Sequence, residues 1–209
     1  MAYFEYGKRE LEYLKSRDKK LGEAIDRIGF VKREIIPDPF RALIYSIVGQ
    51  QVSGKAADTV FGRLTEKAGG ITPGNLAKLE TAEIQSCGMS ARKAGYIKGI
   101  TEAALTGAVD FGNLGKKTDD EIIKILTGLN GVGVWTAEML LIFSLGRPDV
   151  LSFNDFGIRK GIMKLYGLNE LTRGNFMQCR ITYSPYCTTA SIYLWEIAKD
   201  SYAQSVPCL

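Results

Sequence analysis

Residues 126–155, LTGLNGVGVWTAEMLLIFSLGRPDVLSFND, decide the fold of this chain. A short turn at 130–133, with the sequence NGVG, separates two segments whose apolar residues recur at helical spacing. The first segment, 119–127, opens with a Thr and a Glu three residues apart, a capping-box pattern that marks a helix start. The second, 134–145, is strongly apolar. Together they predict a helical hairpin, and an isolated carboxylate, Asp155, closes the stretch.

The two glycines of the turn suggest an ion-binding site. Because Gly131 and Gly133 have no Cβ, they can adopt unusual φ values and let another backbone come close. The amides after them, beginning at Val134, lie at a helix N-terminus and point outward, which suits a phosphate. Carbonyls on the opposite side of such a loop can hold a monovalent cation. The glycines alone are as compatible with a plain connection between two helices.

The residues around the turn, LNGVGVWTA at 129–137, resemble the hairpin of the helix-hairpin-helix (HhH-GPD) DNA glycosylases. In that superfamily a catalytic aspartate follows the hairpin, and Asp155 lies at the matching place, 22 residues after Gly133. SFNDFG, at 152–157, resembles the family's Pro-x-Asp-Asp-x-Gly segment, with the serine and the asparagine as departures. Hairpin and spaced aspartate together are far more specific than either alone. The most similar branch is the 3-methyladenine DNA glycosylase II type.

The resemblance assigns roles to the hairpin backbone. The amides around Gly131, Gly133 and Val134 are expected to bind a DNA phosphate downstream of the lesion. A Na⁺ or K⁺ ion is expected on the carbonyl side, bridged by the backbone oxygens of Thr127, Leu129 and Val132. Backbone contacts of this kind carry no sequence information, so DNA affinity should fall with salt.

The amino-acid composition excludes several kinds of catalytic and metal site. A chain of 209 residues can form one compact domain or two small lobes, and a net charge of +4 allows a nucleic-acid partner without requiring one. The absence of histidine excludes His-based triads and His metal sites. The four cysteines lack metal-ligand spacing, so we expect free thiols, no iron–sulfur cluster and no required cofactor. They are Cys87, Cys179, Cys187 and Cys208.

No apolar run reaches membrane length, and the N-terminus is too charged for a signal peptide. We expect a monomer with no membrane association, cytoplasmic in a bacterium or archaeon and nuclear in a eukaryote. Helical periodicity dominates and predicts an all-α fold. By resemblance, residues 1–209 form one glycosylase unit with a cleft between two lobes. Lobe A is expected over about 1–38 plus 118–209 and lobe B over about 39–117, with the hairpin at 119–145.

A second stretch bears directly on DNA: GQQVS, at 49–53, follows an apolar helix predicted over 40–48. An enzyme that acts on a base must extrude the nucleotide and fill the hole with an inserted side chain. Gln50 and Gln51 are interpreted as this insertion, and the resemblance places Gln51 at the wedge position. The alternative is a polar junction between two helices, with Ser53 capping the second.

Two further segments match motifs of the family. CGMSARKAGYI, at 87–97, matches Gly-x-Ser-x-x-Lys-Ala-x-Tyr-Ile. Its Arg92 and Lys93 are equally compatible with a phosphate contact and with a solvated helix start. PYCTTASIYLW, at 185–195, matches Pro-Tyr-Arg-Ser-x-Ala-x-x-Tyr-Leu-Trp. Cys187 stands where the family usually has Arg, which puts the salt bridge or phosphate contact of that arginine in doubt.

Trp135 and Trp195 are the only tryptophans in the chain. By resemblance both approach the base pocket beside Asp155, and Met139, one helical turn after Trp135, shares that face. N-alkylated purines carry positive charge, and an electron-rich aromatic face attracts a cation. Without the family match, core packing would be the usual role of such aromatic residues.

Asp155 is expected to be the catalytic residue. An ionised carboxylate beside C1′ stabilises an oxocarbenium-like sugar and orients or deprotonates water. The alternative is structural, because Asp155 fits the N-cap of a helix predicted at 156–166; both roles can coexist. Bifunctional relatives carry a lysine two residues after the last hairpin glycine, where this chain has Trp135. We therefore expect a monofunctional hydrolase without strand cleavage.

The expected substrate is double-stranded DNA that contains an alkylated purine such as 3-methyladenine. A leaving group that is already cationic needs no acid, which suits a chain without histidine. Two alternatives stay open. One is a glycosylase of the same fold for uracil, mismatched thymine, hypoxanthine or 8-oxoguanine. The other is a non-catalytic helix-hairpin-helix DNA-binding module, which would need no carboxylate at Asp155.

Overall fold

The computed structural model describes residues 2–199, and the fold is all-α, as the sequence predicted. Among these residues the only strands are β1 (Ala2–Tyr3) and β2 (Glu34–Ile35), which form one short antiparallel pair. The chain divides into two compact units. Unit 1 contains both ends of the chain, Met1–Ile35 and Gly146–Leu209, and unit 2 contains the middle, Ile36–Leu145.

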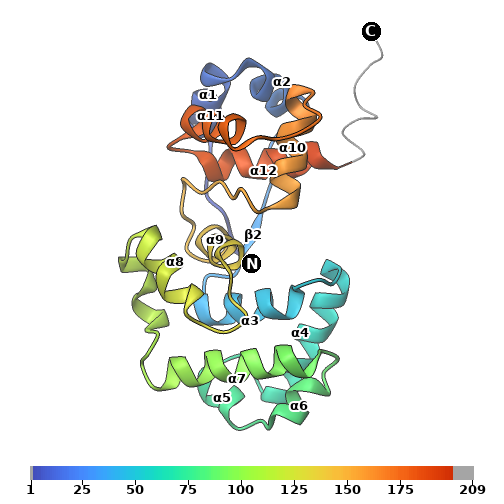
Figure 1. Cartoon of the computed structure of the whole chain (residues 1–209), viewed down its shortest axis with the longest axis vertical. Coiled ribbons are helices and arrows are strands. Elements are labelled where there is room, and N and C mark those ends of the chain that lie inside the picture. The colour runs from blue at the N-terminus through green and yellow to red at the C-terminus, as the bar shows by residue number, and fades with distance from the viewer. Residues whose placement is uncertain (1, 200–209) are drawn as a thin grey trace. The chain divides into compact units, whose positions relative to one another are not determined.

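The described residues of unit 1 form a cluster of five helices (Figure 1). They are α1 (Lys8–Arg17), α2 (Lys19–Ile28), α10 (Phe156–Tyr166), α11 (Arg173–Tyr183) and α12 (Cys187–Ala198). The last helix, α12, runs through the core and buries nearly all of its side chains. It packs closely on α10, since a Cβ added at Gly161 would lie 2.2 Å from the carbonyl oxygen of Leu194. This close packing fixes the start of α10, where Asp155 lies.

Unit 2 contains the remaining helices of the described chain (Figure 1). They are α3 (Pro39–Gly49), α4 (Gly54–Ala68), α5 (Pro73–Ala77), α6 (Thr81–Gln85), α7 (Ala91–Leu105), the 3₁₀ helix η1 (Phe111–Lys116), α8 (Asp119–Thr127) and α9 (Val134–Phe143). The apolar α3 packs against α4, α7 and α9, and its Leu43, Ile44 and Ile47 are fully buried. Ser53 and Thr118 cap their helices as the sequence suggested, and Thr72 caps α5; each accepts an amide hydrogen bond in the first turn.

The hairpin helices α8 and α9 belong to unit 2, whereas the sequence placed residues 118–145 with the two ends of the chain. The reason is the apolar surface of α9, which packs on α3. Asp18 ends α1 and caps α2, because its side chain accepts the Leu21 amide at 3.0 Å. Helix α11 was not predicted, although Thr172 caps it. No helix in the described part of the chain is long and apolar enough to cross a membrane.

Candidate catalytic and DNA-contacting residues

Asp155 is a buried carboxylate at the N-terminus of α10. Its Oδ1 atom accepts two hydrogen bonds, from the Ile158 amide at 2.8 Å and from the Trp195 indole Nε1 at 2.9 Å. Only 7% of the residue is exposed. The capping role weighed from the sequence is therefore present, and the indole bond adds a second, long-range contact. The carboxylate is held from two sides, which is the fixed position that a catalytic group needs.

The indole of Trp195 reaches Asp155 only because residue 157 is glycine. A Cβ at Gly157 would lie 2.6 Å from Trp195 Cδ1 and 3.2 Å from Asp155 Oδ1. Real Cβ atoms essentially never lie within 3.0 Å of another heavy atom, so the 2.6 Å contact would force the indole to shift. The Asp-x-Gly spacing of the sequence motif thus has a packing cause: the glycine makes room for a tryptophan from α12 against the first turn of α10.

The ring of Trp195 has a cationic neighbour within the same unit. The Arg33 guanidinium carbon lies 5.5 Å from the ring centroid, and its Nη2 pairs with Glu196 Oε1 at 3.2 Å. The sequence assigned Trp195 to the base pocket on account of its electron-rich face. In the structure this ring already has a guanidinium beside it, while its N–H is bonded to Asp155. Trp195 therefore positions the carboxylate, whatever contact it makes with a base.

The other two predicted pocket residues lie one turn apart on α9 of unit 2. Trp135 is 38% exposed, although most side chains of this apolar helix are buried. Met139 is buried, with 6% exposed. Core packing, the alternative for both tryptophans, does not describe Trp135.

The hairpin turn has the geometry that its glycines suggested. Gly131 has φ +85, and a Cβ there would lie 2.2 Å from the ring of Tyr96 on α7. Both the left-handed backbone and the close approach of the ring require glycine. Gly133 is extended and forms the N-cap of α9, with no side-chain hydrogen bond to the first-turn amides. The N-terminus of α9 therefore has no cap of its own, as expected for an anion site.

The three carbonyls predicted to hold a monovalent cation lie at the end of α8 and in the turn after it. Thr127 is the last residue of α8, where helix carbonyls lack amide partners and form the negative end of the dipole. The Leu129 carbonyl accepts the Val132 amide at 3.1 Å and keeps a second lone pair. Backbone oxygens of this kind suit Na⁺ or K⁺, so the donor set fits the predicted ion.

The two glutamines that follow α3 have different roles. Gln51 is exposed and has φ +57, the only positive φ at a non-glycine residue among residues 2–199. Strain of this kind clusters at functional sites. Gln50 turns instead toward the hairpin, and its side-chain amide donates to the Gly131 carbonyl at 2.9 Å. Gln51 is thus the exposed one of the two glutamines, and Gln50 ties its loop to the hairpin.

Lys93 has neither of the two roles considered from the sequence. Its ammonium donates to the carbonyls of Val48 at 2.8 Å and Gln50 at 2.6 Å, at the C-terminal end of α3. Burial lowers the pKa of this lysine. Arg92 beside it is exposed. The motif at 87–97 therefore supports two loops. Lys93 binds the loop that carries the two glutamines, and the Tyr96 ring packs against the hairpin turn at Gly131.

Near Cys187, which replaces the family's usual arginine, a different residue supplies the positive charge. Cys187 is buried, and burial raises the pKa of its thiol. Its amide donates to Asp149 Oδ1 at 3.3 Å. Arg180, from α11, donates to the Asp149 carbonyl at 2.9 Å and lies 3.7 Å from the carboxylate. An arginine–carboxylate pair is thus present here, with the arginine on the neighbouring helix.

The cysteines form no metal cluster in the part of the chain that is described. Cys87, Cys179 and Cys187 are buried free thiols, and Cys208 lies outside the described residues. No group of three or more Cys, Asp or Glu side chains with metal-binding geometry occurs among residues 2–199.

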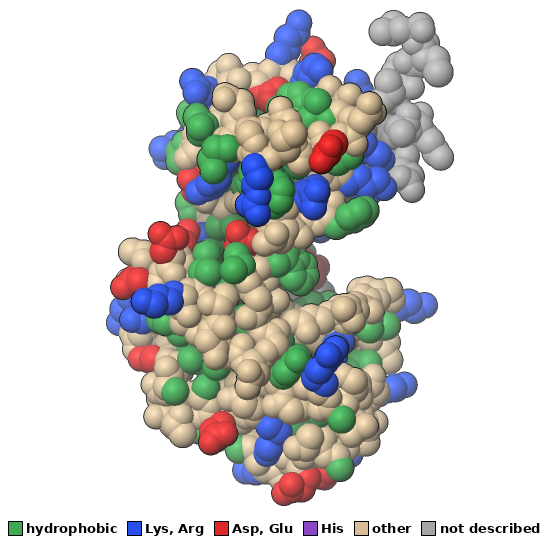
Figure 2. Space-filling view, viewed as in Figure 1, with side chains coloured by type: hydrophobic (Ala, Val, Ile, Leu, Met, Phe, Trp, Pro, Cys, Tyr) green, Lys and Arg blue, Asp and Glu red, His purple; other side chains and the backbone are tan. Residues whose placement is uncertain are grey.

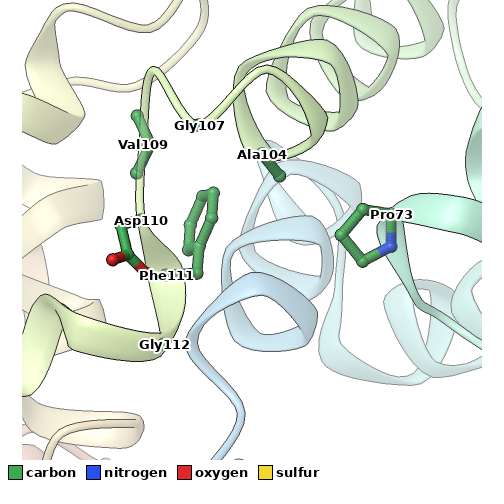
Figure 3. A pocket seen from close by; sticks show the side chains of 7 residues that line it. All are labelled: Pro73, Ala104, Gly107, Val109, Asp110, Phe111 and Gly112. Atoms are coloured by element: carbon green, nitrogen blue, oxygen red, sulfur yellow. The ribbon is translucent and has the colours of Figure 1, made fainter.

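A pocket of about 360 Å³ in unit 2 is not the candidate site (Figure 3). It is lined by residues near α5, the end of α7 and η1, and none of the predicted site residues contributes to it. Its one carboxylate, Asp110, caps η1 and accepts the Asn113 side-chain amide at 2.7 Å. The pocket therefore offers no reactive group.

Comparisons with known proteins identify the family of this chain. Residues 44–179 match the model of the HhH-GPD superfamily base excision DNA repair proteins. DNA-3-methyladenine glycosylase 1 of Schizosaccharomyces pombe is 34% identical over 167 residues, which cover 78% of this chain and 73% of the relative.

Two solved structures have the same fold. One is a crystal structure of a DNA-3-methyladenine glycosidase from Bacillus halodurans, with TM-score 0.84 and 36% identity, covering 98% of this chain and 95% of that chain. The other is the Schizosaccharomyces pombe 3-methyladenine DNA glycosylase in complex with abasic DNA. It has TM-score 0.82 and 30% identity, and the match covers 90% of this chain and 96% of that chain. The chain belongs to the HhH-GPD superfamily of base excision DNA repair proteins.

Proposed function

We propose that this protein is a DNA glycosylase of base excision repair that hydrolyses the N-glycosidic bond of alkylated purines such as 3-methyladenine. The names of the relatives and solved structures support this substrate class. The observation that carries the proposal is the buried Asp155, fixed by the Ile158 amide and the Trp195 indole. A DNA-binding module has no use for a carboxylate held in this way.

Asp155 acts on the sugar. As the bond to the base breaks, C1′ gains positive charge, and an ionised carboxylate beside it stabilises that charge. The same carboxylate orients the attacking water, as carboxylates do at other glycosidic centres. Alkylated purines leave as neutral bases because they start with a positive charge, so the step needs no general acid. A chain without histidine is suited to such substrates.

The enzyme is monofunctional in this proposal. A lyase needs an amine that attacks C1′ and forms a Schiff base. The position that carries this lysine in bifunctional relatives is Trp135, which has no amine and is exposed on α9. Water is then the nucleophile, and the product is an abasic site in an intact strand. Trp135, Met139 and Trp195 are the proposed contacts of the flipped base.

Unit 2 supplies the proposed DNA contacts. The uncapped amides at the start of α9, around Gly133 and Val134, bind a backbone phosphate. A Na⁺ or K⁺ ion on the hairpin carbonyls would add positive charge next to that phosphate. Gln51, exposed and strained, enters the duplex and fills the place of the flipped nucleotide. The protein works as a monomer on double-stranded DNA that contains a damaged base.

The test is base release from a panel of duplexes, each assayed with and without alkali. The panel contains methylated DNA, hypoxanthine, uracil, a G·T mispair and 8-oxoguanine. We expect release of 3-methyladenine, with strand breaks only after alkali. Breaks without alkali would contradict the monofunctional mechanism, and release of uracil or mispaired thymine alone would contradict the substrate class. The Asp155→Asn variant should bind abasic DNA and release no base; unchanged release would contradict the assignment of Asp155.

A further inference from the structure

Two arginines of unit 1 rest on one aromatic ring close to Asp155. The guanidinium carbon of Arg173 lies 3.9 Å from the centroid of the Phe153 ring, and that of Arg159 lies 5.1 Å from it. The ring itself is anchored, because it packs edge-on against the buried Phe176 at 5.1 Å between centroids. The pair of guanidinium groups is therefore held by the core of the unit.

Neither guanidinium has an anionic partner within the part of the chain that is described. No ion pair or side-chain hydrogen bond joins Arg159 or Arg173 to another of residues 2–199. Stacking uses the face of a guanidinium and leaves its N–H groups, which lie in the plane, for bidentate bonds to an oxyanion. Two neighbouring cations also repel each other, and a bound anion would remove that repulsion. The arrangement is a receptor for an oxyanion.

The position of this pair relative to Asp155 is set by the helix. The Arg159 amide donates to the Asp155 carbonyl at 3.0 Å, so the arginine begins one helical turn after the carboxylate. Arg173 is the first residue of α11, so both arginines lie near helix N-termini, where the dipole is also positive. Figure 2 shows further Lys and Arg side chains on the visible face of unit 1. The same helix start thus carries both the candidate carboxylate and one arginine of the pair.

The chemistry of the substrate identifies this anion. A nucleotide whose C1′ lies at Asp155 carries a phosphodiester on each side of the same sugar. One of these two phosphates is therefore always within a few bonds of the reacting carbon. A planar, bidentate donor is the side chain that matches a phosphate best. The phosphate site proposed for the hairpin, at the N-terminus of α9 in unit 2, is a separate one.

We propose that Arg159 and Arg173, stacked on Phe153, form a second phosphate-binding site, which binds a phosphodiester next to the damaged nucleotide and holds its sugar at Asp155. This inference rests on the proposed function. The hairpin would fix the strand at a distance from the lesion, and the arginine pair would fix the nucleotide that reacts.

The experiment removes one charge from the DNA and its partner from the protein. Duplexes contain a tetrahydrofuran abasic analogue, with either normal backbone or a neutral methylphosphonate at the phosphate on the 5′ or the 3′ side. Dissociation constants are measured for the wild type, Arg159→Gln, Arg173→Gln and the double variant. Arg17→Gln, which removes an exposed charge at the end of α1 in the same unit, is the matched control.

We expect one of the two methylphosphonates to weaken wild-type binding about tenfold to a hundredfold, the value of a charge-assisted hydrogen bond. The double variant should lose a similar factor on normal DNA and lose little more on the neutral duplex. Its slope of log affinity against log salt should fall by about 0.9, the value for one phosphate. Arg17→Gln should match the wild type in the response to each methylphosphonate.

Additive losses, in which the double variant responds to both methylphosphonates as the wild type does, would overturn the proposal. The Phe153→Leu variant keeps an apolar side chain but removes the aromatic ring. It should lose less affinity than the wild type when the phosphate is replaced by the methylphosphonate. The same loss as in the wild type would contradict the role of the ring. Circular dichroism establishes that each variant is folded. Because the binding assay needs no excision, its result is separate from the result of the base-release panel.

Discussion

Replacing Lys93 by methionine tests whether the loop that carries Gln50 and Gln51 depends on hydrogen bonds from the Lys93 ammonium. The ammonium of Lys93 binds the carbonyls of Val48 and Gln50, and the Gln50 side chain binds the Gly131 carbonyl. These bonds hold the loop in which Gln51 has φ +57. Methionine keeps the straight apolar stem of the lysine and removes only the charged donor. The variant therefore loses the support of the loop without a cavity in the core.

The expected magnitudes follow from these contacts. A hydrogen bond from a charged group is worth about 1.5–3 kcal/mol, and less where water can reach the acceptor. Because Lys93 is only part-buried, we expect its two bonds to contribute about 2 kcal/mol to the free energy of unfolding. The left-handed backbone of Gln51 costs about 1–2 kcal/mol, which the loop would release by relaxing. A relaxed loop lowers the rate of base excision about tenfold, because 1.36 kcal/mol corresponds to a factor of ten.

The same helix provides a matched control. Lys98 on α7 also binds two backbone carbonyls, those of Ala77 at 3.2 Å and Leu79 at 2.8 Å, but away from the glutamine loop. Urea unfolding and single-turnover excision are measured for both methionine variants, well below their melting temperatures. Lys98→Met should lose stability and keep the wild-type excision rate. A wild-type rate in Lys93→Met, or equal slowing in both variants, would refute the reasoning.

Three further predictions concern other contacts. Gly157→Ala should slow base excision at least tenfold, because its Cβ would displace the Trp195 indole from the carboxylate; single-turnover kinetics measures this. Gly131→Ala should destabilise the protein by about 2–4 kcal/mol in urea unfolding, since the left-handed backbone and the overlap with the Tyr96 ring both cost energy. Hydrogen bonds lower the pKa of Asp149 despite its burial, so its stabilising effect is present above the unfolded pKa of about 3.9 and is lost as the pH falls further. The stability difference between the wild type and Asp149→Asn should then shrink in acid.

Each of these predictions has a contradicting outcome. Gly174→Ala, near the start of α11, places its Cβ 3.8 Å from the nearest atom, and it should be neutral in both assays. If alanine had the same effect at Gly131, Gly157 and Gly174, the cause would be reduced backbone freedom and not a steric clash. In the Gly131→Ala/Tyr96→Leu double variant the overlap is removed and the backbone strain stays, so partial recovery is expected. A stability difference for Asp149→Asn that is the same at pH 2 and pH 7 would contradict the lowered pKa.

The local structure of the site was predictable because it depends on short-range patterns. The hairpin helices at 119–127 and near 134–145, and the helix at 156–166, follow from apolar spacing, caps and glycines. The N-cap role of Asp155 was readable for the same reason, since a cap involves residues three positions apart.

Contacts between distant residues were not predictable from these patterns. Trp195 is 40 residues from the carboxylate that it binds, and Lys93 is 43 residues from Gln50. The motif around Lys93 was recognised, but its lysine was assigned to phosphate or to solvent. No spacing rule connects an ammonium on one helix with the carbonyls at the end of another.

The sequence by itself determined the all-α fold and the hairpin, because helical periodicity, caps and turn glycines act over a few residues. Its resemblance to a known superfamily singled out Asp155 as the candidate carboxylate. Only the tertiary structure decided which side chain holds Asp155, why Gly157 must be glycine, and which of the two glutamines is exposed for insertion. These features depend on the close packing of α12 on α10 and of α7 under the hairpin. Packing of this kind brings together residues that the sequence keeps far apart.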